Sequence, residues 1–545
     1  MGSIEVPSFQ EGNLGLDYDV VVIGAGLSGM YSLVKMRELG LRTRVIEAGS
    51  GVGGTWFWNR YPGARFDSES WSYQYSWSKE LLDEWNWTEH FSPQPETLKY
   101  CQYVSKKFDL ERDIQFNTRI TSAHWQDDGR YWQLTDDAGK VYTSRFLITA
   151  MGLLNQATLP DIPGVKDFKG IGMHTSRWRD DVSLEGKRVG IIGTGATAIQ
   201  TIQEIAKTVG HLTVFQRQPN WAAPLHNSKI SAEEMAEIRK QYPEIFKKCN
   251  ESYSCFIHKA DPRKTMSLSK EERLAFLEEV YAKPGFAKVL GIFGDCAFDK
   301  EANAEVSEFF ANKIRQRVHD PEVAEKLIPK NHGFGTKRLP LETFYFEVYN
   351  QPNVKLKDIS EDPIERITER GVKTKSGEEV ELDILIYATG FDAVTGAFTA
   401  IDFQGVGGEK IMDTWAEGPR TQLGLLVHNF PNMMMILGPH QMFGNIPRSV
   451  EYAVNWTADC IKFCRDNNIT RINATPQGVV DWTDHVHKCA VGLLANDVDS
   501  WMTGVNKNVK HKQKRIIARY NGPAPGYRAL AQGVADRGYV DFDLS

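Results

Sequence analysis

The fold of this 545-residue chain is decided by the stretch Asp19-Val-Val-Val-Ile-Gly24-Ala-Gly26-Leu-Ser-Gly29. Its apolar half is typical of a parallel strand that is buried on both faces. Its glycines allow a tight turn, a close approach of the backbone to a pyrophosphate, and close packing of the following helix. A helix is expected over residues 30–39 and a second strand over residues 41–47. This strand–helix–strand order predicts a dinucleotide site at the N-terminus of the helix.

Glu47 ends the second strand of this unit and has a specific expected role. A carboxylate at that point of a dinucleotide-binding unit accepts hydrogen bonds from the ribose hydroxyls. We therefore expect Gly24, Gly26, Gly29 and Glu47 to bind a dinucleotide whose ribose carries no phosphate.

A second unit of the same kind begins at Arg188. Its strand, residues 188–192, is followed by Gly193-x-Gly195-x-x-Ala198, by a helix to about residue 209 and by a strand over residues 212–216. No acid follows that strand, because the sequence continues with Arg217 and Gln218. A carboxylate would repel a 2′-phosphate, whereas a guanidinium binds it through two parallel hydrogen bonds. Gly193, Gly195, Arg217 and Gln218 are therefore expected to bind NADP.

The composition limits the functions that the chain can have. It is 41% hydrophobic and 25% charged, with a formal net charge of −6 and with Lys and Arg spread along its length, which is not typical of nucleic-acid-binding proteins. No apolar run approaches the ~20 residues of a membrane span. The seven cysteines have neither disulfide-framework nor zinc spacing. These features predict a cytoplasmic protein that binds no nucleic acid, no membrane and no metal.

Four further stretches lie outside the two units and carry candidate functional residues. In chain order they are Gly53-Gly54-Thr-Trp56-Phe-Trp-Asn-Arg-Tyr-Pro-Gly-Ala-Arg-Phe-Asp67, Phe168-x-Gly170-x-x-x-His174-x-x-x-Trp178, Gly335-Thr-Lys337-Arg338-Leu-Pro340 and Ser500-Trp501-Met-Thr-Gly-Val-Asn506. The first is typical of a loop laid along a flavin, where Gly54 allows close backbone approach and Trp56 covers the ring. The second is spaced too irregularly for a helix or strand, so packing alone explains it poorly. Taken singly, Asp67 is compatible with a turn cap, the basic pair with a solvated surface, and Trp501 with the core.

Together with the two glycine-rich units, these stretches resemble the type I Baeyer–Villiger monooxygenases, the family of the cyclohexanone and phenylacetone monooxygenases. The resemblance extends from Val20 to beyond Trp501. It implies an NADPH-dependent FAD monooxygenase that inserts one oxygen atom next to a ketone carbonyl and gives an ester or lactone through a C4a-peroxyflavin. One departure is Arg179, which follows Trp178 where the family usually has Pro or Asp.

The resemblance also implies roles for individual residues. Arg338 is the expected catalytic arginine and Asp67 the residue that orients it, since a fixed guanidinium stabilises negatively charged oxygen in a dry site. Lys337 is the expected second contact to the 2′-phosphate of NADP. His174 is expected to couple domain movement to catalysis. Trp501 is expected on a C-terminal loop that closes over nicotinamide and substrate.

The expected fold is an α/β protein with two Rossmann-like dinucleotide-binding domains, for FAD and NADP, and a helical insertion in the NADP domain. The insertion is indicated by charged, helix-periodic sequence and by two candidate capping boxes, Ser231-x-x-Glu234 and Ser269-x-x-Glu272. The expected division is an FAD domain over residues 1–150 and 388–545, which includes the C-terminal active-site loop, an NADP domain over residues 151–226 and 331–387, and the insertion over residues 227–330.

Three other functions are compatible with part of these features, and the residues argue against each of them to a different degree. A flavin-containing N- or S-oxygenase shares both units but is expected to lack the pair of Arg338 and Asp67. A pyridine-nucleotide disulfide reductase needs a redox cysteine pair after the first unit, and the sequence has none there. A flavin-binding sensor without turnover would not need Arg338 and Asp67 together with Lys337 and Trp501. For the favoured function the expected partners are a small-molecule ketone and O2, and the chain is expected to be a monomer or a weak homo-oligomer.

Overall fold

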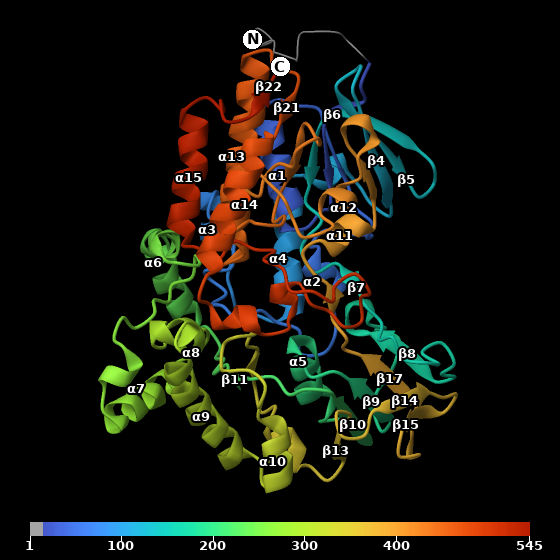
Figure 1. Cartoon of the computed structure of the whole chain (residues 1–545), viewed down its shortest axis with the longest axis vertical. Coiled ribbons are helices and arrows are strands. Elements are labelled where there is room, and N and C mark those ends of the chain that lie inside the picture. The colour runs from blue at the N-terminus through green and yellow to red at the C-terminus, as the bar shows by residue number, and fades with distance from the viewer. Residues whose placement is uncertain (1–14) are drawn as a thin grey trace.

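Two sheets with parallel strands at their centres organise the protein, which the computed structural model describes over residues 15–545. The first sheet has eight strands in the order β19-β4-β5-β6-β1-β2-β3, with β20 beside β6. The second sheet has five strands in the order β13-β10-β9-β17-β8. In Figure 1 the first sheet lies in the upper half of the view and the second in the lower half. The predicted α/β class with two Rossmann-like units is confirmed.

The first sheet contains the first glycine-rich unit at its centre. Its strands are β1 (Tyr18–Ile23), β2 (Thr43–Ile46), β3 (Ile114–Gln115), β4 (Ile120–Gln126), β5 (Tyr131–Asp136), β6 (Val141–Thr149), β19 (Asp402–Gln404) and β20 (Met433–Met435). β1 runs parallel to β2 and to β6, with Val20 opposite Thr43 and Phe146. Val20 is fully buried, as an apolar strand covered on both faces requires.

The helix of the first unit is longer at its start than the sequence predicts. α1 spans Leu27–Glu38, whereas the prediction was residues 30–39. The fingerprint itself supplies the first helical turn, from Leu27. Gly29 packs so closely in this turn that a Cβ atom would lie 1.8 Å from the carbonyl oxygen of Gly24. Gly40 then turns the chain with a φ of 72°, a conformation that favours glycine.

The second sheet is parallel throughout and contains the second unit. Its strands and following helix are β8 (Ile171–His174), β9 (Arg188–Ile192), β10 (His211–Gln216), β13 (Val354–Asp358), β17 (Ile384–Tyr387) and α5 (Ala196–Ile205). The predicted helix to residue 209 ends earlier, at Ile205, because the backbone N–H groups of Lys207 and Thr208 donate only three residues back, to Glu204 at 3.3 Å and to Ile205 at 3.1 Å. The two predicted strands of the second unit, β9 and β10, begin and end within one residue of the predicted positions.

Five helices follow the second unit and form the lower left part of Figure 1. They are α6 (Ala232–Glu251), α7 (Lys270–Ala282), α8 (Ala287–Leu290), α9 (Lys300–Arg317) and α10 (Pro321–Leu327). The Ser269 capping box is complete. The second candidate box is only half formed, because Ser231 caps α6 while the Glu234 carboxylate pairs with His90 at 3.0 Å.

The remaining segments complete the first half of the molecule. α13 packs along α1, and three C-terminal helices cover this side of the first sheet in Figure 1. The bounds of these and the smaller elements are α2 (Thr55–Trp58), α3 (Lys79–Glu84), α4 (Gln94–Lys107), α11 (Gly396–Thr399), α12 (Ile411–Thr414), α13 (Ile446–Asp466), α14 (Pro476–Ala490), α15 (Ala524–Asp536), β7 (Gln156–Ala157), β11 (Ala223–Pro224), β12 (Leu341–Glu342), β14 (Ile364–Ile367), β15 (Gly371–Thr374), β16 (Glu379–Glu381), β18 (Phe391–Asp392), β21 (Ile472–Asn473) and β22 (Asp543–Leu544).

The chain crosses between the two sheets twice, and the two crossings lie side by side. β7 follows the first sheet, β18 leads back to it, and the two pair antiparallel. Thr158 reinforces this pair, since its backbone N–H donates to the carbonyl oxygen of Gly390 at 3.0 Å. The predicted return of the chain to the first sheet after residue 387 is consistent with this path, although the exact domain boundaries stay predictions.

The loop after the first unit docks on α5 of the second unit. The Tyr61 hydroxyl donates to Gln200 Oε1 at 2.9 Å, and Gln200 Nε2 donates to the carbonyl oxygen of Arg65 at 3.0 Å. Gly63 has a φ of +81°, and a Cβ atom there would lie 2.2 Å from the carbonyl oxygen of Gln200. A glycine is therefore required for both its backbone conformation and its close approach.

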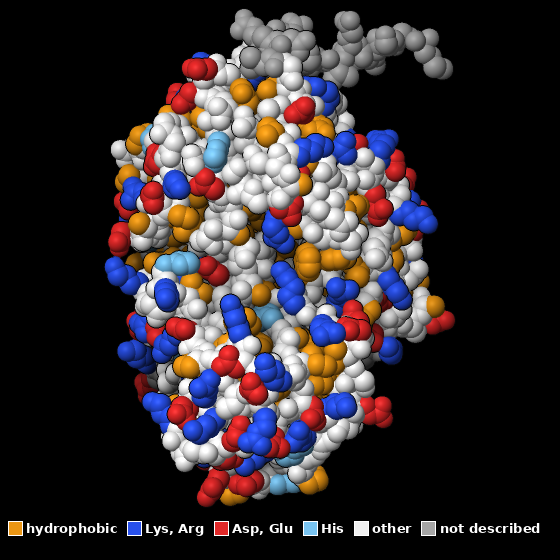
Figure 2. Space-filling view, turned by 90° about the vertical axis from the view of Figure 1, so that its right-hand side faces the viewer, with side chains coloured by type: hydrophobic (Ala, Val, Ile, Leu, Met, Phe, Trp, Pro, Cys, Tyr) orange, Lys and Arg blue, Asp and Glu red, His pale blue; other side chains and the backbone are white. Residues whose placement is uncertain are grey.

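The helices and one face of the surface can be compared with the expectation that the protein binds neither a membrane nor nucleic acid. None of the helices in residues 15–545 is long and apolar enough to cross a bilayer. On the face shown in Figure 2, Lys and Arg side chains are interspersed with Asp and Glu, and hydrophobic side chains form small separate groups. This face therefore presents charges of both signs.

The contact at Gly63 gives a test of how the two units are held together. Gly63→Ala should lower stability by about 1–3 kcal/mol more than a matched variant, because it adds a clash to the backbone strain. The matched variant is Gly139→Ala, where φ is +82° and no atom lies within 4 Å of the Cβ position. Urea denaturation followed by the fluorescence of the 14 tryptophans measures both. Equal losses would contradict the docking role of Gly63.

Candidate functional site

The first glycine-rich turn has the geometry of a dinucleotide site. Gly24 has a φ of +104°, and a Cβ atom there would lie 2.6 Å from the carbonyl oxygen of Ala150. Gly26 faces Gly54 of the next loop, whose Cα atom lies 3.4 Å from the Cβ position of Gly26. Glu47 is buried and accepts a hydrogen bond from the backbone N–H of Ala25 at 2.7 Å. Glu47 is therefore fixed at the turn with further acceptor capacity on its carboxylate.

The second turn is more open where a phosphate group would approach. Gly193 has a φ of +114° and lies close to the end of β17, whereas a Cβ atom on Gly195 would meet nothing within 4 Å. Gln218 is exposed just beyond β10, and its carbonyl oxygen accepts a hydrogen bond from the Thr194 hydroxyl at 2.6 Å. The predicted residues Gly193, Gly195 and Gln218 thus surround one turn.

Arg217 and Lys337 lie on segments that meet although they are distant in sequence, because Asn220 Nδ2 donates to the carbonyl oxygen of Arg338 at 3.3 Å. Burial lowers the pKa of the Lys337 ammonium, and the positive charge of Arg217 lowers it further. Within residues 15–545 neither side chain has an ion-pair or hydrogen-bond partner. Two unpaired cations on neighbouring segments form a site for an anion, because a negative group between them offsets their mutual repulsion.

Asp67 and Arg338 form an ion pair between the two halves of the molecule. The Arg338 Nη2 atom lies 2.9 Å from Asp67 Oδ2, and the Asp67 side chain is fully buried. The same oxygen accepts a hydrogen bond from the backbone N–H of Leu341 at 3.0 Å. Burial raises the pKa of the Asp67 carboxyl, and the charge of Arg338 opposes that rise. The pair thus lies in a poorly hydrated place where electrostatic interactions are strong.

One nitrogen of this guanidinium has no partner within the described chain. Arg338 Nη1 is buried and makes no hydrogen bond, although the side chain as a whole is 32% exposed. A buried donor without a partner is uncommon in a folded protein. The arrangement therefore suits a negatively charged oxygen that binds at Nη1.

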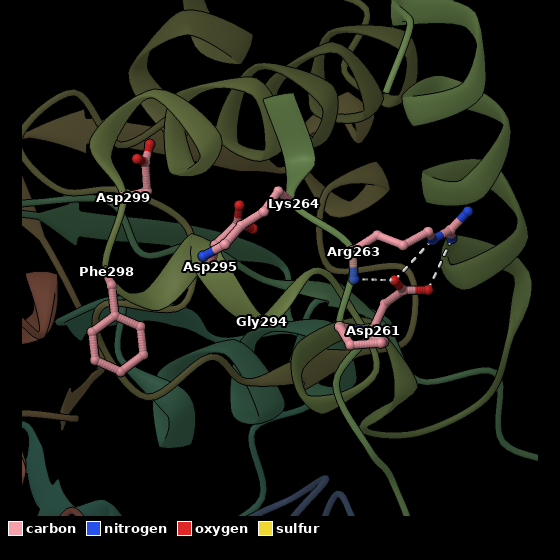
Figure 3. Close-up of a pocket in the computed structure, with 8 residues that line it drawn as sticks. Asp261, Arg263, Lys264, Gly294, Asp295, Phe298 and Asp299 are labelled. Carbon is pink, nitrogen blue, oxygen red and sulfur yellow. Dashed lines mark hydrogen bonds and ion pairs between the residues drawn. The ribbon is translucent and has the colours of Figure 1, made fainter. Parts of the chain in front are cut away.

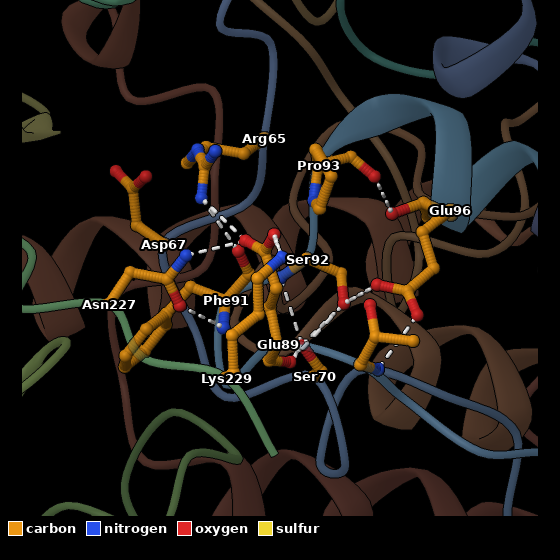
Figure 4. A network of polar contacts seen from close by, with 12 residues as sticks. Arg65, Asp67, Ser70, Glu89, Phe91, Ser92, Pro93, Glu96, Asn227 and Lys229 are labelled. Carbon is orange, nitrogen blue, oxygen red and sulfur yellow. Dashed lines mark hydrogen bonds and ion pairs between the residues drawn. The ribbon is translucent and has the colours of Figure 1, made fainter. Parts of the chain in front are cut away.

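A polar network fixes the segment on which Asp67 lies (Figure 4). Arg65 donates to the carbonyl oxygen of Phe91 at 2.9 Å, and Glu89 accepts hydrogen bonds from Asn227 and Lys229 at 2.6 Å each. In Figure 4 the Asp67 carboxylate points away from Glu89 and its partners. The network therefore holds the backbone and leaves Asp67 free to pair with Arg338.

His174 joins the end of β8 to the second crossing. Its Nδ1 atom accepts a hydrogen bond from the backbone N–H of Ser176 at 3.1 Å, so the proton is on Nε2, which donates to the carbonyl oxygen of Gly390 at 3.1 Å. Burial lowers the pKa of His174 to about 4. The ring is therefore neutral at neutral pH and acts as a fixed bridge.

Arg179, which departs from the family pattern, lies on the surface beside this bridge. Its guanidinium pairs with Asp181 at 2.6 Å, and both side chains are exposed. Arg179 therefore makes none of the hydrogen bonds that position His174.

Trp501 lies in the C-terminal loop, where it begins a short helical turn, Trp501–Thr503. Its partly buried ring packs against a small apolar cluster. The members of this cluster are Leu154, Ala393, Val394, Phe443, Ile516 and Ala518. Asn506 fixes the loop to the second crossing, since its Nδ2 atom donates to the carbonyl oxygen of Phe391 at 2.8 Å.

Trp56, which is expected to cover a flavin, packs among other aromatic side chains. Its ring is 7% exposed and packs edge-on against Phe66 and Tyr73 at centroid distances of 5.5 and 5.9 Å. The side chain is part of the core of the first half. Its contact with a cofactor stays a prediction.

Two glutamines of α5 belong to the site and were missed by the sequence interpretation. Gln200 holds the loop that precedes Asp67, as described above, and Gln203 Oε1 accepts a hydrogen bond from the backbone N–H of Thr343 at 2.8 Å. Both are buried. A signal was available, because buried glutamines in an otherwise apolar helix need hydrogen-bond partners elsewhere.

A cavity of about 440 Å³ lies apart from all the predicted site residues (Figure 3). It lies beside α9, and its acids already have partners. Asp261 pairs with Arg263 at 2.8 Å, Asp295 accepts a hydrogen bond from the Thr265 hydroxyl at 2.7 Å, and Asp299 caps α9. These contacts stabilise the helical segment and give each of the three acids a partner.

Comparison with known proteins supplies the family. The sequence profile of the flavin-binding monooxygenase-like family matches residues 17–235. The 2-oxo-Delta(3)-4,5,5-trimethylcyclopentenylacetyl-CoA monooxygenase of Pseudomonas putida is 43% identical over 97% of this chain and 98% of its own length. A cyclohexanone 1,2-monooxygenase of an Acinetobacter species is 41% identical and a phenazine N-monooxygenase of Lysobacter antibioticus 40% identical, each over 97% of both chains.

Solved structures agree over the same length. A crystal structure of OTEMO in complex with FAD and NADP matches with a TM-score of 0.94 and 42% identity, over 97% of this chain and 100% of that one. The closed crystal structure of cyclohexanone monooxygenase also matches with a TM-score of 0.94, at 40% identity over 97% of this chain and 99% of that one. With such relatives over nearly its whole length, the chain belongs to the Baeyer–Villiger monooxygenases that use FAD and NADPH.

Proposed function

We propose that the protein converts ketones into esters or lactones and that Arg338 is its catalytic residue. The observation that carries this proposal is the ion pair with Asp67, which leaves one buried guanidinium nitrogen without a partner among residues 15–545. When a nucleophilic oxygen adds to a ketone carbonyl, the carbonyl oxygen becomes negatively charged. A guanidinium held in one orientation stabilises that charge and does not lose its own proton.

Both cofactors fit the residues that are present. The facing glycines 26 and 54 leave a side-chain-free surface at the first turn, where Glu47 would contact the ribose of FAD. At the second turn, Gly195 opens onto free space, and the unpaired Arg217 and Lys337 would hold the 2′-phosphate of NADPH. When bound, the cofactors supply the reducing equivalents and the activation of O2.

The chain's own residues would then orient Arg338, bind the ketone and exclude water from the site. Asp67, which is fully buried, orients Arg338 through Oδ2. The apolar cluster around Trp501 offers a surface for the hydrocarbon part of a ketone. His174 ends β8, and its neutral ring is hydrogen-bonded to Gly390, so a movement of the second sheet would also move the second crossing.

A second candidate function is oxygenation of nitrogen. It is favoured by the relative named phenazine N-monooxygenase, which is 40% identical over 97% of both chains. Attack by an aromatic nitrogen creates no carbonyl oxyanion, so this reaction would not need Arg338 in the same way. Product analysis with cyclohexanone and with phenazine distinguishes the two.

We further propose that the protein works in the cytoplasm as a monomer or weak homo-oligomer and has the domain division given above. The seven free cysteines, six of them buried, suit a reducing compartment. The membership of strands in two separate sheets supports a division close to residues 150 and 388.

Arg338→Ala should retain FAD but lose ester formation by about 10²–10³-fold, because it removes one preorganised contact to a developing oxyanion. Asp67→Ala should lose less, since it orients the arginine without contacting substrate. Ester yield, NADPH consumption and hydrogen peroxide release are measured together. Because the first variant leaves a buried carboxylate without its counter-charge, its melting temperature is measured against Arg338→Lys. Ester formation at the wild-type rate would show that Arg338 is structural.

Arg217→Ala should weaken the preference for NADPH over NADH. Each lost contact between a charged side chain and the phosphate costs about 1.5–3 kcal/mol, so the Michaelis constant for NADPH should rise while that for NADH changes little. An unchanged ratio of the two constants would contradict the assignment. Arg263→Ala, on a surface far from both turns and paired with Asp261, is the control.

His174→Ala should keep bound FAD and lose oxygenation by up to about 10²-fold, because misplacement of distant groups carries a penalty of that size. The matched control is Ser176→Ala, which removes a hydroxyl 2.9 Å from Nδ1 but keeps the backbone N–H donor. Flavin absorbance and lactone yield are the two measurements. Apoprotein, or full activity, would contradict a coupling role for His174.

A further inference from the structure

The carboxyl edge of the second sheet gathers residues from three strands. β9, β10 and β17 run parallel, so the segments that follow them emerge at the same edge. Gly193 follows β9, Arg217 follows β10 and Thr389 lies just beyond β17. In open parallel sheets this edge is where dinucleotides bind.

The C-terminal loop is held against this edge by two asparagines. Asn506 donates to the carbonyl oxygen of Phe391 at 2.8 Å, and Asn508 donates to that of Thr389 at 3.4 Å. The two also contact each other, because the backbone N–H of Asn508 donates to Asn506 Oδ1 at 2.9 Å. Lys507 lies between them, and its side chain is exposed.

Lys507 adds its positive charge to this edge of the sheet. Burial and then the charge of Arg217 are the main causes that lower the pKa of Lys337, and the charge of Lys507 lowers it as well. Asp499 acts in the opposite direction, but it is engaged by Arg515 at 2.7 Å.

None of the three cations, Arg217, Lys337 and Lys507, has an ion-pair or hydrogen-bond partner within residues 15–545. Three unpaired positive charges at one edge repel one another and are stabilised together by a dianion. A phosphate monoester has that charge and several acceptor oxygens.

We propose that Lys507 is a third cation of the 2′-phosphate site, so that the C-terminal loop takes part in selecting NADPH over NADH. The inference rests on the NADP contacts proposed for Arg217 and Lys337. The 2′-phosphate is favoured over the pyrophosphate because the segments proposed to bind it already carry the cations Arg217 and Lys337, whereas the open pyrophosphate turn is formed by Gly193 and Gly195. A lysine suits the position, since its flexible stem delivers a point charge from a loop.

The test compares two ligands that differ only in that phosphate. Affinities of the FAD-loaded protein for 2′,5′-ADP and for 5′-AMP are measured by calorimetry, which needs no turnover. Lys507→Ala should weaken 2′,5′-ADP binding about tenfold, the scale of one exposed charged contact, and should leave 5′-AMP binding unchanged. Lys507→Arg should restore most of the affinity. The matched control is Lys510→Ala, which removes an exposed, unpaired lysine three residues further along the loop.

Three results would overturn the inference. They are an unchanged affinity for 2′,5′-ADP, an equal loss for both ligands, and an equal loss in Lys510→Ala. Arg217→Ala serves as the reference for the proposed function. If it loses the preference for 2′,5′-ADP while Lys507→Ala keeps it, the role of Lys507 fails and the NADP site stands. If both variants keep the preference, the two assignments fail together.

Discussion

The buried pairing of Asp67 with Arg338 is the constraint on which the rest of the site depends. A carboxylate without solvent and without a partner is strongly destabilising, so the two halves of the molecule must meet for Asp67 to be accommodated. Other hydrogen bonds also hold the two halves of the molecule together. Gln200 and Gln203 extend from α5 to the segments on either side. Arg317 pairs with the buried Glu342 at 2.6 Å and so fixes β12, the strand that follows Arg338.

The helices of residues 232–327 take part in this arrangement. Arg317 is the last residue of α9, and it pairs with both Glu342 and Glu347 at 2.6 Å. Aromatic side chains of the same helix pack in one cluster with strands of the second sheet. The segment thus fixes the strand that follows Arg338 while contributing none of the predicted site residues.

Much of this could be predicted because the informative patterns are local. The two glycine-rich turns are short, and their conformations depend on residues a few positions apart, so strand, turn and helix followed from the sequence. The start of α1 was misjudged because the fingerprint itself forms the first turn. Glu234 was expected to cap its own helix, but His90, a distant residue, pairs with it instead. The hydrogen bonds of Gln200 and Asn506 could not be anticipated, because they depend on which distant backbone carbonyls come within reach.

The two crossings between the sheets have a mechanical consequence. Each contributes only a two-residue strand, β7 or β18, to the pair that joins the halves. Such a narrow ribbon resists stretching, because covalent backbone runs along both edges, but it resists torsion weakly. Thr158 and His174 both donate to the one carbonyl oxygen of Gly390, which acts as a shared pivot. Substitutions that stiffen this ribbon would therefore restrict the rotation of one half of the molecule against the other.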